Sequence, residues 1–146
     1  MVVDVDGDVC VEVGGLALTS APRNLTVARV DIHSMLSFQR LDVYQRAIEF
    51  LALVYEIVAE VPRGHAERCD QLVRAAESVV RNIAEGAGRW SDADSSKHYK
   101  IARGETMEAA ASLDIMKLKQ LVAQARYNQG IELLEAVVAM VSKMVR

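Results

Sequence analysis

Residues 74–89 of this 146-residue chain read RAAESVVRNIAEGAGR, an alanine-rich stretch with the composition of a helix. At about 100° per residue, six polar side chains in and just before this stretch fall within an arc of about 80°. A second arc of the same helix is apolar, and a third carries charged residues that would face water. We call the first arc the polar stripe; its members are Gln71, Arg74, Ser78, Asn82, Glu85 and Arg89.

The polar stripe has two interpretations. In the structural one, Ser78 and Asn82 lie against a neighbouring helix, while Arg74 and Glu85 exchange hydrogen bonds with partners such as Glu108 on the third helix. Polar networks of this kind must be satisfied when buried, and they can fix register or assembly. In the functional interpretation, the stripe lines a groove or an oligomer channel that holds a ligand.

The composition favours packed helices in one domain. Hydrophobic residues make up 51% of the chain and aromatic residues only 5%, and two prolines with eight glycines leave long stretches uninterrupted. The net charge is −3, and residues 1–33 carry all of this acidic excess. Because the rest of the chain is neutral, binding to nucleic acid would require a local basic patch.

Hydrophobic periodicity and helix-breaking residues predict four helices with short connections. This pattern is typical of an antiparallel up-down-up-down four-helix bundle, an all-α fold that we expect to occupy residues 35–146. The first helix has an apolar arc of about 220°, wider than one bundle seam needs, so we expect part of it to face another subunit. The first, second and fourth predicted helices cover residues 38–61, 66–87 and 129–144, the last after an Asn128 cap. The third is expected to begin between residues 92 and 96, any of which can cap it, and to continue to about 125.

Residues 1–34 form a different kind of segment. Valines alternate with acidic residues from Val3 to Val13, which is the period of a strand. An isolated hairpin is marginal in water, so we expect either a disordered tail or a weak hairpin. A further hypothesis is that the natural protein starts at Met35, next to the predicted bundle.

Three ordered motifs resemble one known family. They read FQRLDVYQRA at residues 38–47, QLVRAAESVVRNIAEGAGR at 71–89 and IARGETME at 101–108. The family is the bacterial four-helix-bundle proteins encoded in intervening sequences of 23S ribosomal RNA genes. The resemblance implies a homo-oligomer, in known cases a pentamer. It also implies kinship with bundle proteins that accompany diversity-generating retroelements and engage nucleic acid or a reverse transcriptase through basic surfaces.

Two residues depart from the family pattern. Val80 stands where relatives commonly have a proline, so the second helix should be straighter and better hydrogen bonded here. Glu105 replaces a small serine, and a charge at a close-packed position needs a partner or water.

A basic cluster near the junction of the second and third helices is the candidate nucleic-acid site. Binding of RNA or DNA would depend on how many phosphates such a cluster neutralises, and Trp90 could stack on a base. The alternative is an ordinary solvated surface, because acidic residues are interspersed. The candidate residues are Arg74, Arg81, Arg89, Lys97, Lys100 and Arg103.

No catalytic, metal or cofactor site is expected. His33, His65 and His98 are separate in sequence, with His98 alone on the third helix, and no Glu-x-x-His pair of a di-iron bundle occurs. Two lone cysteines and the absence of a long apolar run favour a reduced, cytoplasmic protein with no membrane span. We therefore expect a non-enzymatic, self-assembling scaffold or accessory protein, with a nucleic-acid-binding accessory as the alternative.

Overall fold

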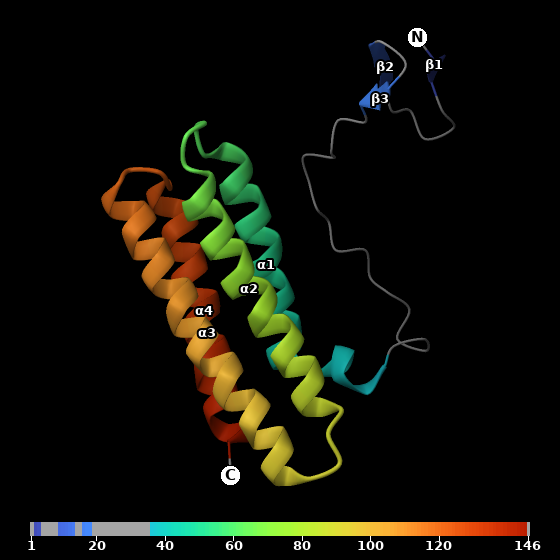
Figure 1. Cartoon of the computed structure of the whole chain (residues 1–146), viewed down its shortest axis with the longest axis vertical. Coiled ribbons are helices and arrows are strands. Elements are labelled where there is room, and N and C mark those ends of the chain that lie inside the picture. Colours follow the sequence, from blue (N-terminus) through green and yellow to red (C-terminus); the bar gives the residue numbers. More distant parts are fainter. Residues whose placement is uncertain (1, 4–8, 14–15, 19–35, 146) are drawn as a thin grey trace.

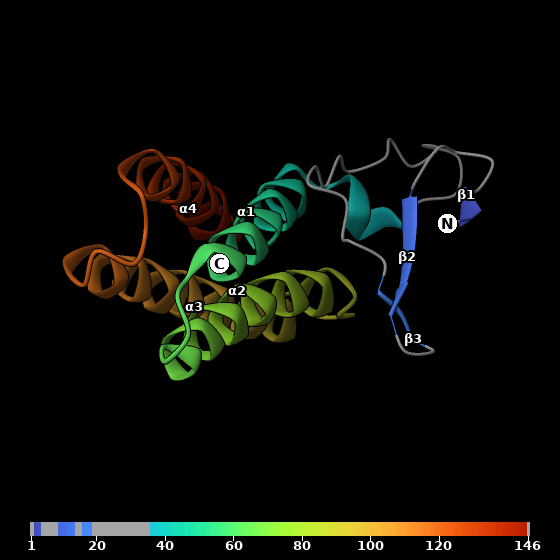
Figure 2. The ribbon, with the colours of Figure 1, turned by 90° about the horizontal axis from the view of Figure 1, so that it is seen from above.

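The computed structural model describes residues 2–3, 9–13, 16–18 and 36–145, and its main body is a four-helix bundle (Figure 1). A 3-10 turn at Ser37–Arg40 precedes α1 (Asp42–Glu60), α2 (Ala66–Ala87), α3 (Asp92–Leu118) and α4 (Gln124–Met144). Each helix packs on the next, and α4 closes the ring by packing on α1. The expected all-α bundle is confirmed, with α1 and α3 at diagonal corners (Figure 2).

Three short strands precede the bundle. They are β1 (Val2–Val3), β2 (Val9–Val13) and β3 (Leu16–Leu18), and they pair antiparallel in the order β1-β2-β3. Val11 lies opposite Leu18 in the β2–β3 pair. The expected boundary between tail and bundle, and the possible start at Met35, lie outside the described residues.

Apolar residues at helical spacing make the core. On α1, Val43, Phe50, Val54 and Ile57 are at most 4% exposed, so one face of the helix is buried along its whole length. The core has two sections stacked along the bundle. The section near Phe50 contains Leu72, Leu113 and Leu134, and the other contains Val43, Ala47, Val79, Ile83, Tyr99, Ala102, Val137 and Val141.

Small residues allow α2 and α3 to approach closely. Ala75, Ala76 and Ala109 are at most 1% exposed in the core section near Phe50. Further along, a Cβ atom at Gly86 would lie 2.6 Å from Cε1 of Tyr99, so only glycine fits beside that ring. This close contact lets side chains on the edge of α2 reach residues of α3.

The connection between α3 and α4 differs from the prediction. We expected the third helix to continue to Ala125, but it ends at Leu118 because Gln120 takes a left-handed conformation with φ 59°. The Leu121 amide donates to the Met116 carbonyl at 2.8 Å, a bond that closes a helix end in this way. Because α4 then starts at Gln124, Asn128 lies inside that helix and does not cap it.

The start of α3, at Asp92, falls at the first residue of the predicted range, although the capping residue is one position earlier. Ser91 is the N-cap, and its Oγ accepts a hydrogen bond from the Asp94 amide at 3.2 Å. The polar segment SDADSS at residues 91–96 is therefore mostly helix. The first helix starts later than the predicted residue 38. Residues 37–40 form the 3-10 turn, and α1 begins at Asp42.

Candidate functional site

The polar stripe runs along α2 next to α3, and most of it is open to solvent. Ser78 and Asn82 are half-buried, whereas the four outer members are exposed. Asn82 Nδ2 donates to the Ser78 carbonyl at 2.9 Å and to Ser78 Oγ at 3.2 Å. The exposed members are Gln71, Arg74, Glu85 and Arg89.

His98 of α3 completes this network, although the sequence placed it alone. Its Nδ1 lies 3.3 Å from Asn82 Oδ1 and 3.6 Å from Glu85 Oε2, and its side chain is only 15% exposed. Glu85 also pairs with Arg89 one turn along α2. The polar network therefore joins two helices, and it leaves Asn82 with partners on both its oxygen and its nitrogen.

A sequence signal could have revealed His98. In an antiparallel helix pair with a short turn, residues at similar distances before and after the turn face one another. Asn82 and His98 stand in that relation, because they lie six residues before and seven residues after the turn at residues 88–91. Sequence spacing along a single helix does not show this.

The predicted bonds to Glu108 are absent. Glu85 pairs instead with Arg89 and His98, which are nearer to the turn. Arg74 and Glu108 are both exposed, and neither makes an ion pair or hydrogen bond with another described residue. The part of the polar stripe far from the turn is thus unpartnered within residues 36–145.

The basic cluster does not form one patch within the subunit. Arg81 pairs with Glu77 at 3.1 Å, and Glu77 also accepts from Tyr55 of α1 at 3.0 Å. Arg103 lies on the other side, where its Nε donates to Ser142 Oγ of α4 at 3.1 Å. Of the remaining residues, Arg89 is partly neutralised by Glu85, and the exposed ones are Arg74, Lys97 and Lys100.

A row of exposed residues follows the side of α3 that no other described helix covers. Ile101, Ile115 and Leu118 are 40%, 43% and 85% exposed. Small residues and one acid stand between them, at the alternating spacing of three and four typical of a helix-packing seam. We call this row the α3 outer face; it comprises Ile101, Gly104, Glu108, Ala111, Ile115 and Leu118.

A second partly exposed row lies on α1. It comprises Ile48, Ala52, Tyr55 and Ala59, and we call it the α1 outer face. Tyr55 is 40% exposed. Partial burial, with the hydrogen bond to Glu77, raises the pKa of Tyr55 above its ordinary value. This row belongs to the wide apolar arc that the sequence indicated.

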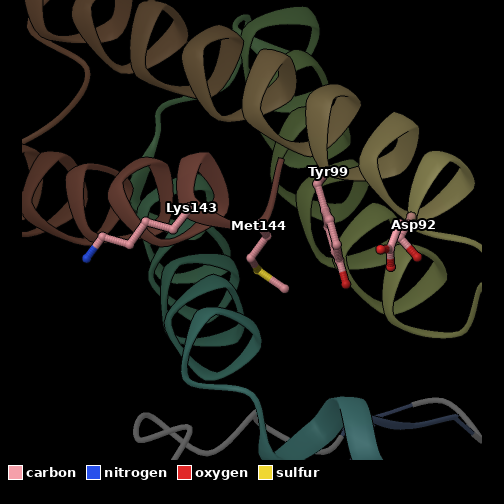
Figure 3. Close-up of a pocket in the computed structure, with 5 residues that line it drawn as sticks. Asp92, Tyr99, Lys143 and Met144 are labelled. Atoms are coloured by element: carbon pink, nitrogen blue, oxygen red, sulfur yellow. The ribbon is translucent and has the colours of Figure 1, made fainter. Parts of the chain in front are cut away.

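Two open hollows lie between α3 and α4. One, of about 300 Å³, is lined by Asp92, Ser95, Tyr99, Lys143 and Met144. Burial raises the pKa of Tyr99, which favours its neutral hydroxyl. Figure 3 shows the Lys143 amine pointing away from Tyr99 and Asp92, so these polar groups do not converge on one point.

The second hollow, of about 400 Å³, is lined by Lys100, Arg103, Ser142 and Val145. Among residues 36–145 and the short strands, no three His, Cys, Asp or Glu side chains are grouped to hold a metal ion. None of the described helices combines the length and apolar character that crossing a bilayer requires.

Comparison with known proteins supports the family resemblance. The family model for the 23S rRNA-intervening sequence protein matches residues 39–143. A crystal structure from Bacteroides thetaiotaomicron VPI-5482, of a protein with unknown function from the S23 ribosomal protein family, superposes with a TM-score of 0.66 at 18% identity. That match covers 71% of this chain and 98% of the other. No curated protein matches.

Neither of these two descriptions names a catalytic activity. The structural match, at this identity, shows a shared fold. The family match spans the whole helical part of the chain, from the 3-10 turn to the last turn of α4. The chain therefore belongs to the 23S rRNA-intervening sequence protein family.

Proposed function

We propose that this protein is a non-enzymatic, self-assembling scaffold or accessory protein of the cytoplasm, and that its subunits join through the α3 outer face. The observation that carries this proposal is the exposure of Ile101, Ile115 and Leu118 along one seam of α3. Scattered apolar residues on a surface need no explanation, but a row of them at packing spacing marks an interaction surface.

The gain from covering this seam is large enough to drive association. Full burial of one isoleucine or leucine side chain contributes about 1.5–3 kcal/mol. Ile101, Ile115 and Leu118 are each partly covered already, so together they supply several kcal/mol. Repetition in a closed assembly multiplies this contribution, which is how weak single contacts build a stable oligomer.

A second copy of the chain is the partner that we propose. The seam contains Glu108, and the neighbouring polar stripe contains Arg74, two exposed charges of opposite sign without a partner among the described residues. Another copy brings both a matching apolar row and the complementary charges. Five subunits are expected, because the family resemblance implies a pentamer.

The experiment is a measurement of mass in solution by size exclusion with light scattering. We expect the wild type to run as an oligomer and Ile115→Glu to shift strongly toward monomer. Ala139→Glu, which adds the same charge at an exposed position of α4, is the matched control and should keep the wild-type mass. A monomeric wild type, or equal masses for all three proteins, would exclude this function.

Nucleic-acid binding is tested on the wild type and on Arg81→Glu. Because Arg81 and Arg103 lie on opposite sides of the α2–α3 pair, a single subunit offers no continuous basic surface. We therefore expect little binding to RNA or DNA at about 50 mM salt. Tight binding that weakens steeply with salt and is lost in Arg81→Glu would establish the alternative function.

A further inference from the structure

We propose that the second hollow between α3 and α4 binds a phosphate dianion, either free or as the end group of a small molecule. Its lining offers two cations and a hydroxyl group and contains no acid: Lys100, Arg103, Ser142 and Val145. This inference concerns a ligand and not a contact between subunits. It therefore stands or falls separately from the proposed self-assembly.

The Arg103 guanidinium is fixed at the wall of this hollow. Its Nε donates to Ser142 Oγ at 3.1 Å, which joins α3 to α4 where the two helices lie side by side (Figure 1). This bond uses the Nε–H only, so the N–H donors of both terminal nitrogens stay available. No acidic side chain among the described residues pairs with Arg103. The planar fork is thus oriented before an anion binds, which lowers the entropic cost of binding.

The Ser142 hydroxyl is oriented by the same bond. Its oxygen accepts from Arg103, so its own hydrogen remains free to donate to another group. No other described residue bonds to this hydroxyl. Hydrogen-bond donors therefore stand on both walls of the hollow, and the one side-chain oxygen between them already accepts a bond from Arg103.

Lys100 supplies the second positive charge. It lies three residues before Arg103, so the two side chains share one side of α3. Its ammonium makes no ion pair or hydrogen bond with another described residue. By contrast, the arginines 81, 89 and 126 are each paired with a glutamate. In this hollow two cations stand together without a counter-charge, and an anion between them would relieve their repulsion.

Acidic side chains of the described residues lie away from this hollow. On α3 the nearest acid in sequence is Glu105, which helical angle places about 160° from Arg103. On α4 it is Glu135, about two turns and 10 Å before Ser142. Asp92 lines the first hollow and not this one. The local charge is therefore positive, although the net charge of the chain is −3.

The numbers of charges and donors select the ligand. A carboxylate has a single charge and a pair of oxygens, which one guanidinium fork satisfies. A phosphomonoester carries a charge of about −1.5 to −2 near pH 7 and has three acceptor oxygens. Lys100, Arg103 and Ser142 together match that charge and offer a donor to each oxygen.

The hollow has room for more than the phosphate itself. Its volume of about 400 Å³ lies within the range of small-molecule sites, about 300–1,000 Å³. Val145 is half-buried and adds an apolar wall beside the polar groups. A phosphate attached to a small apolar group therefore fills the hollow better than inorganic phosphate does.

A nucleic-acid strand is the competing ligand. A strand is held by a row of cations that follows its backbone, and each of its phosphates carries one charge. Residues 104–116 of α3 and residues 127–142 of α4 contain no lysine or arginine. The cations of this groove are thus confined to one end of the helix pair, which suits a compact dianion and not an extended strand.

Stabilisation of the end of α4 is the other explanation for these cations. A positive charge near the C-terminal end of a helix stabilises it modestly. Lys143, in the last turn of α4, already supplies such a charge. Arg103 donates to the Ser142 hydroxyl and not to a carbonyl of that turn. If this were the whole role of Arg103, its neutralisation would lower stability and leave anion binding unchanged.

The test is isothermal titration calorimetry of the full chain at constant ionic strength, with phenyl phosphate, inorganic phosphate and acetate as probes. We expect both phosphates to bind, and acetate to bind at least about ten-fold more weakly. Phenyl phosphate should bind about 3- to 10-fold more tightly than inorganic phosphate, because Val145 covers part of its ring. The reverse order would support the site and identify free phosphate as its ligand. No measurable binding of either phosphate at about 10 mM would overturn the proposal.

Variants locate the bound anion. Arg103→Gln should weaken phenyl phosphate binding by about 10- to 100-fold, since it removes a charge-assisted fork, and Lys100→Gln by about 3- to 10-fold. Lys119→Gln is the matched control, because it removes the same charge at the far end of α3, outside the hollow. It should change the dissociation constant by less than about two-fold. Equal weakening by Lys119→Gln and Lys100→Gln would mean attraction by surface charge in general and would overturn the proposal.

A milder variant covers the case in which Arg103→Gln unfolds. Ser142→Ala keeps both cations and removes only the hydroxyl, and it should weaken phenyl phosphate binding by about 3- to 10-fold. Circular dichroism and light scattering should show this variant folded and with the wild-type mass. Unchanged binding by folded Ser142→Ala would contradict a site built on the pair of Arg103 and Ser142.

Competition with a strand separates the two kinds of ligand. A single-stranded DNA of about ten nucleotides should not displace phenyl phosphate at a strand concentration equal to the phenyl phosphate dissociation constant. Displacement at lower strand concentrations, lost in Lys100→Gln, would assign this surface to nucleic acid and overturn the proposal.

Discussion

The two sides of α3 contain similar amino acids in opposite surroundings. On the inner side, Ala102, Ala109 and Leu113 have no exposed surface, and even the Thr106 hydroxyl is buried, donating to the Ala102 carbonyl at 2.7 Å. On the outer side, Ile101, Ile115 and Leu118 are at least 40% exposed. The inner side holds the subunit together. The outer side contributes little to the isolated subunit, and it is the side that the proposed assembly would cover.

The largest expected difference in stability is between alanine variants of two leucines that lie five positions apart on α3. Leu113→Ala removes a fully buried side chain and should lower the free energy of unfolding by about 2–5 kcal/mol. Leu118→Ala, at 85% exposure, should leave the subunit about as stable and lower the oligomer mass. Urea unfolding at one fixed subunit concentration, with light scattering, measures both. Equal losses of stability would mean that α3 has no distinct outer side.

Two glycines make the next comparison. Gly86→Ala places a Cβ against the Tyr99 ring and should cost about 1–3 kcal/mol. Gly104→Ala meets open space and should stabilise the isolated subunit by about 0.5–1 kcal/mol. Thermal unfolding of both variants in the Ile115→Glu background, which isolates the subunit, checks the opposite signs. Destabilisation by Gly104→Ala would show that Gly104 serves a purpose inside the subunit.

The polar stripe should also contain one residue that stabilises the subunit, Asn82, and one that does not, Arg74. Asn82→Ala removes the bonds to Ser78 and His98 and should cost about 0.5–1.5 kcal/mol of subunit stability. Arg74→Ala removes an exposed side chain without a partner among the described residues, so it should change subunit stability by less than about 0.5 kcal/mol. Chemical denaturation decides between them. A larger loss of stability for Arg74→Ala than for Asn82→Ala would mean that the end of the stripe near Arg74, and not the end near Asn82, stabilises the subunit.

The smallest effect concerns alkaline pH. Burial raises the pKa of Tyr99 above its ordinary value of 10.0, so folding favours the neutral hydroxyl. That contribution is fully present below the pKa of the unfolded chain and is lost as pH rises through the raised pKa of the folded state. Tyr99→Phe should therefore flatten the loss of stability above about pH 10. An unchanged pH profile would mean that Tyr99 titrates as it does in the unfolded chain.

Local sequence signals were sufficient to predict the bounds of the second helix, but they were insufficient to predict where α3 ends and α4 begins. Alanine content and flanking glycines placed the helix at residues 66–87, as the structure has it. The break after Leu118 depends on Gln120 in a left-handed conformation, which glycine or asparagine would usually occupy. Because glutamine has no such preference, the sequence contained no signal for the end of α3, and the helix was predicted to continue to residue 125.

The sequence by itself determined the helical bundle, its family and the position of the polar stripe on one helix, because periodicity and motifs are properties of a single segment. Only the tertiary structure decided that His98 joins Asn82 and Glu85, and that Arg81 and Arg103 lie on opposite sides. It also decided which apolar residues of α3 remain exposed. These facts depend on how the helices rotate against one another, and side-chain packing between segments sets that rotation.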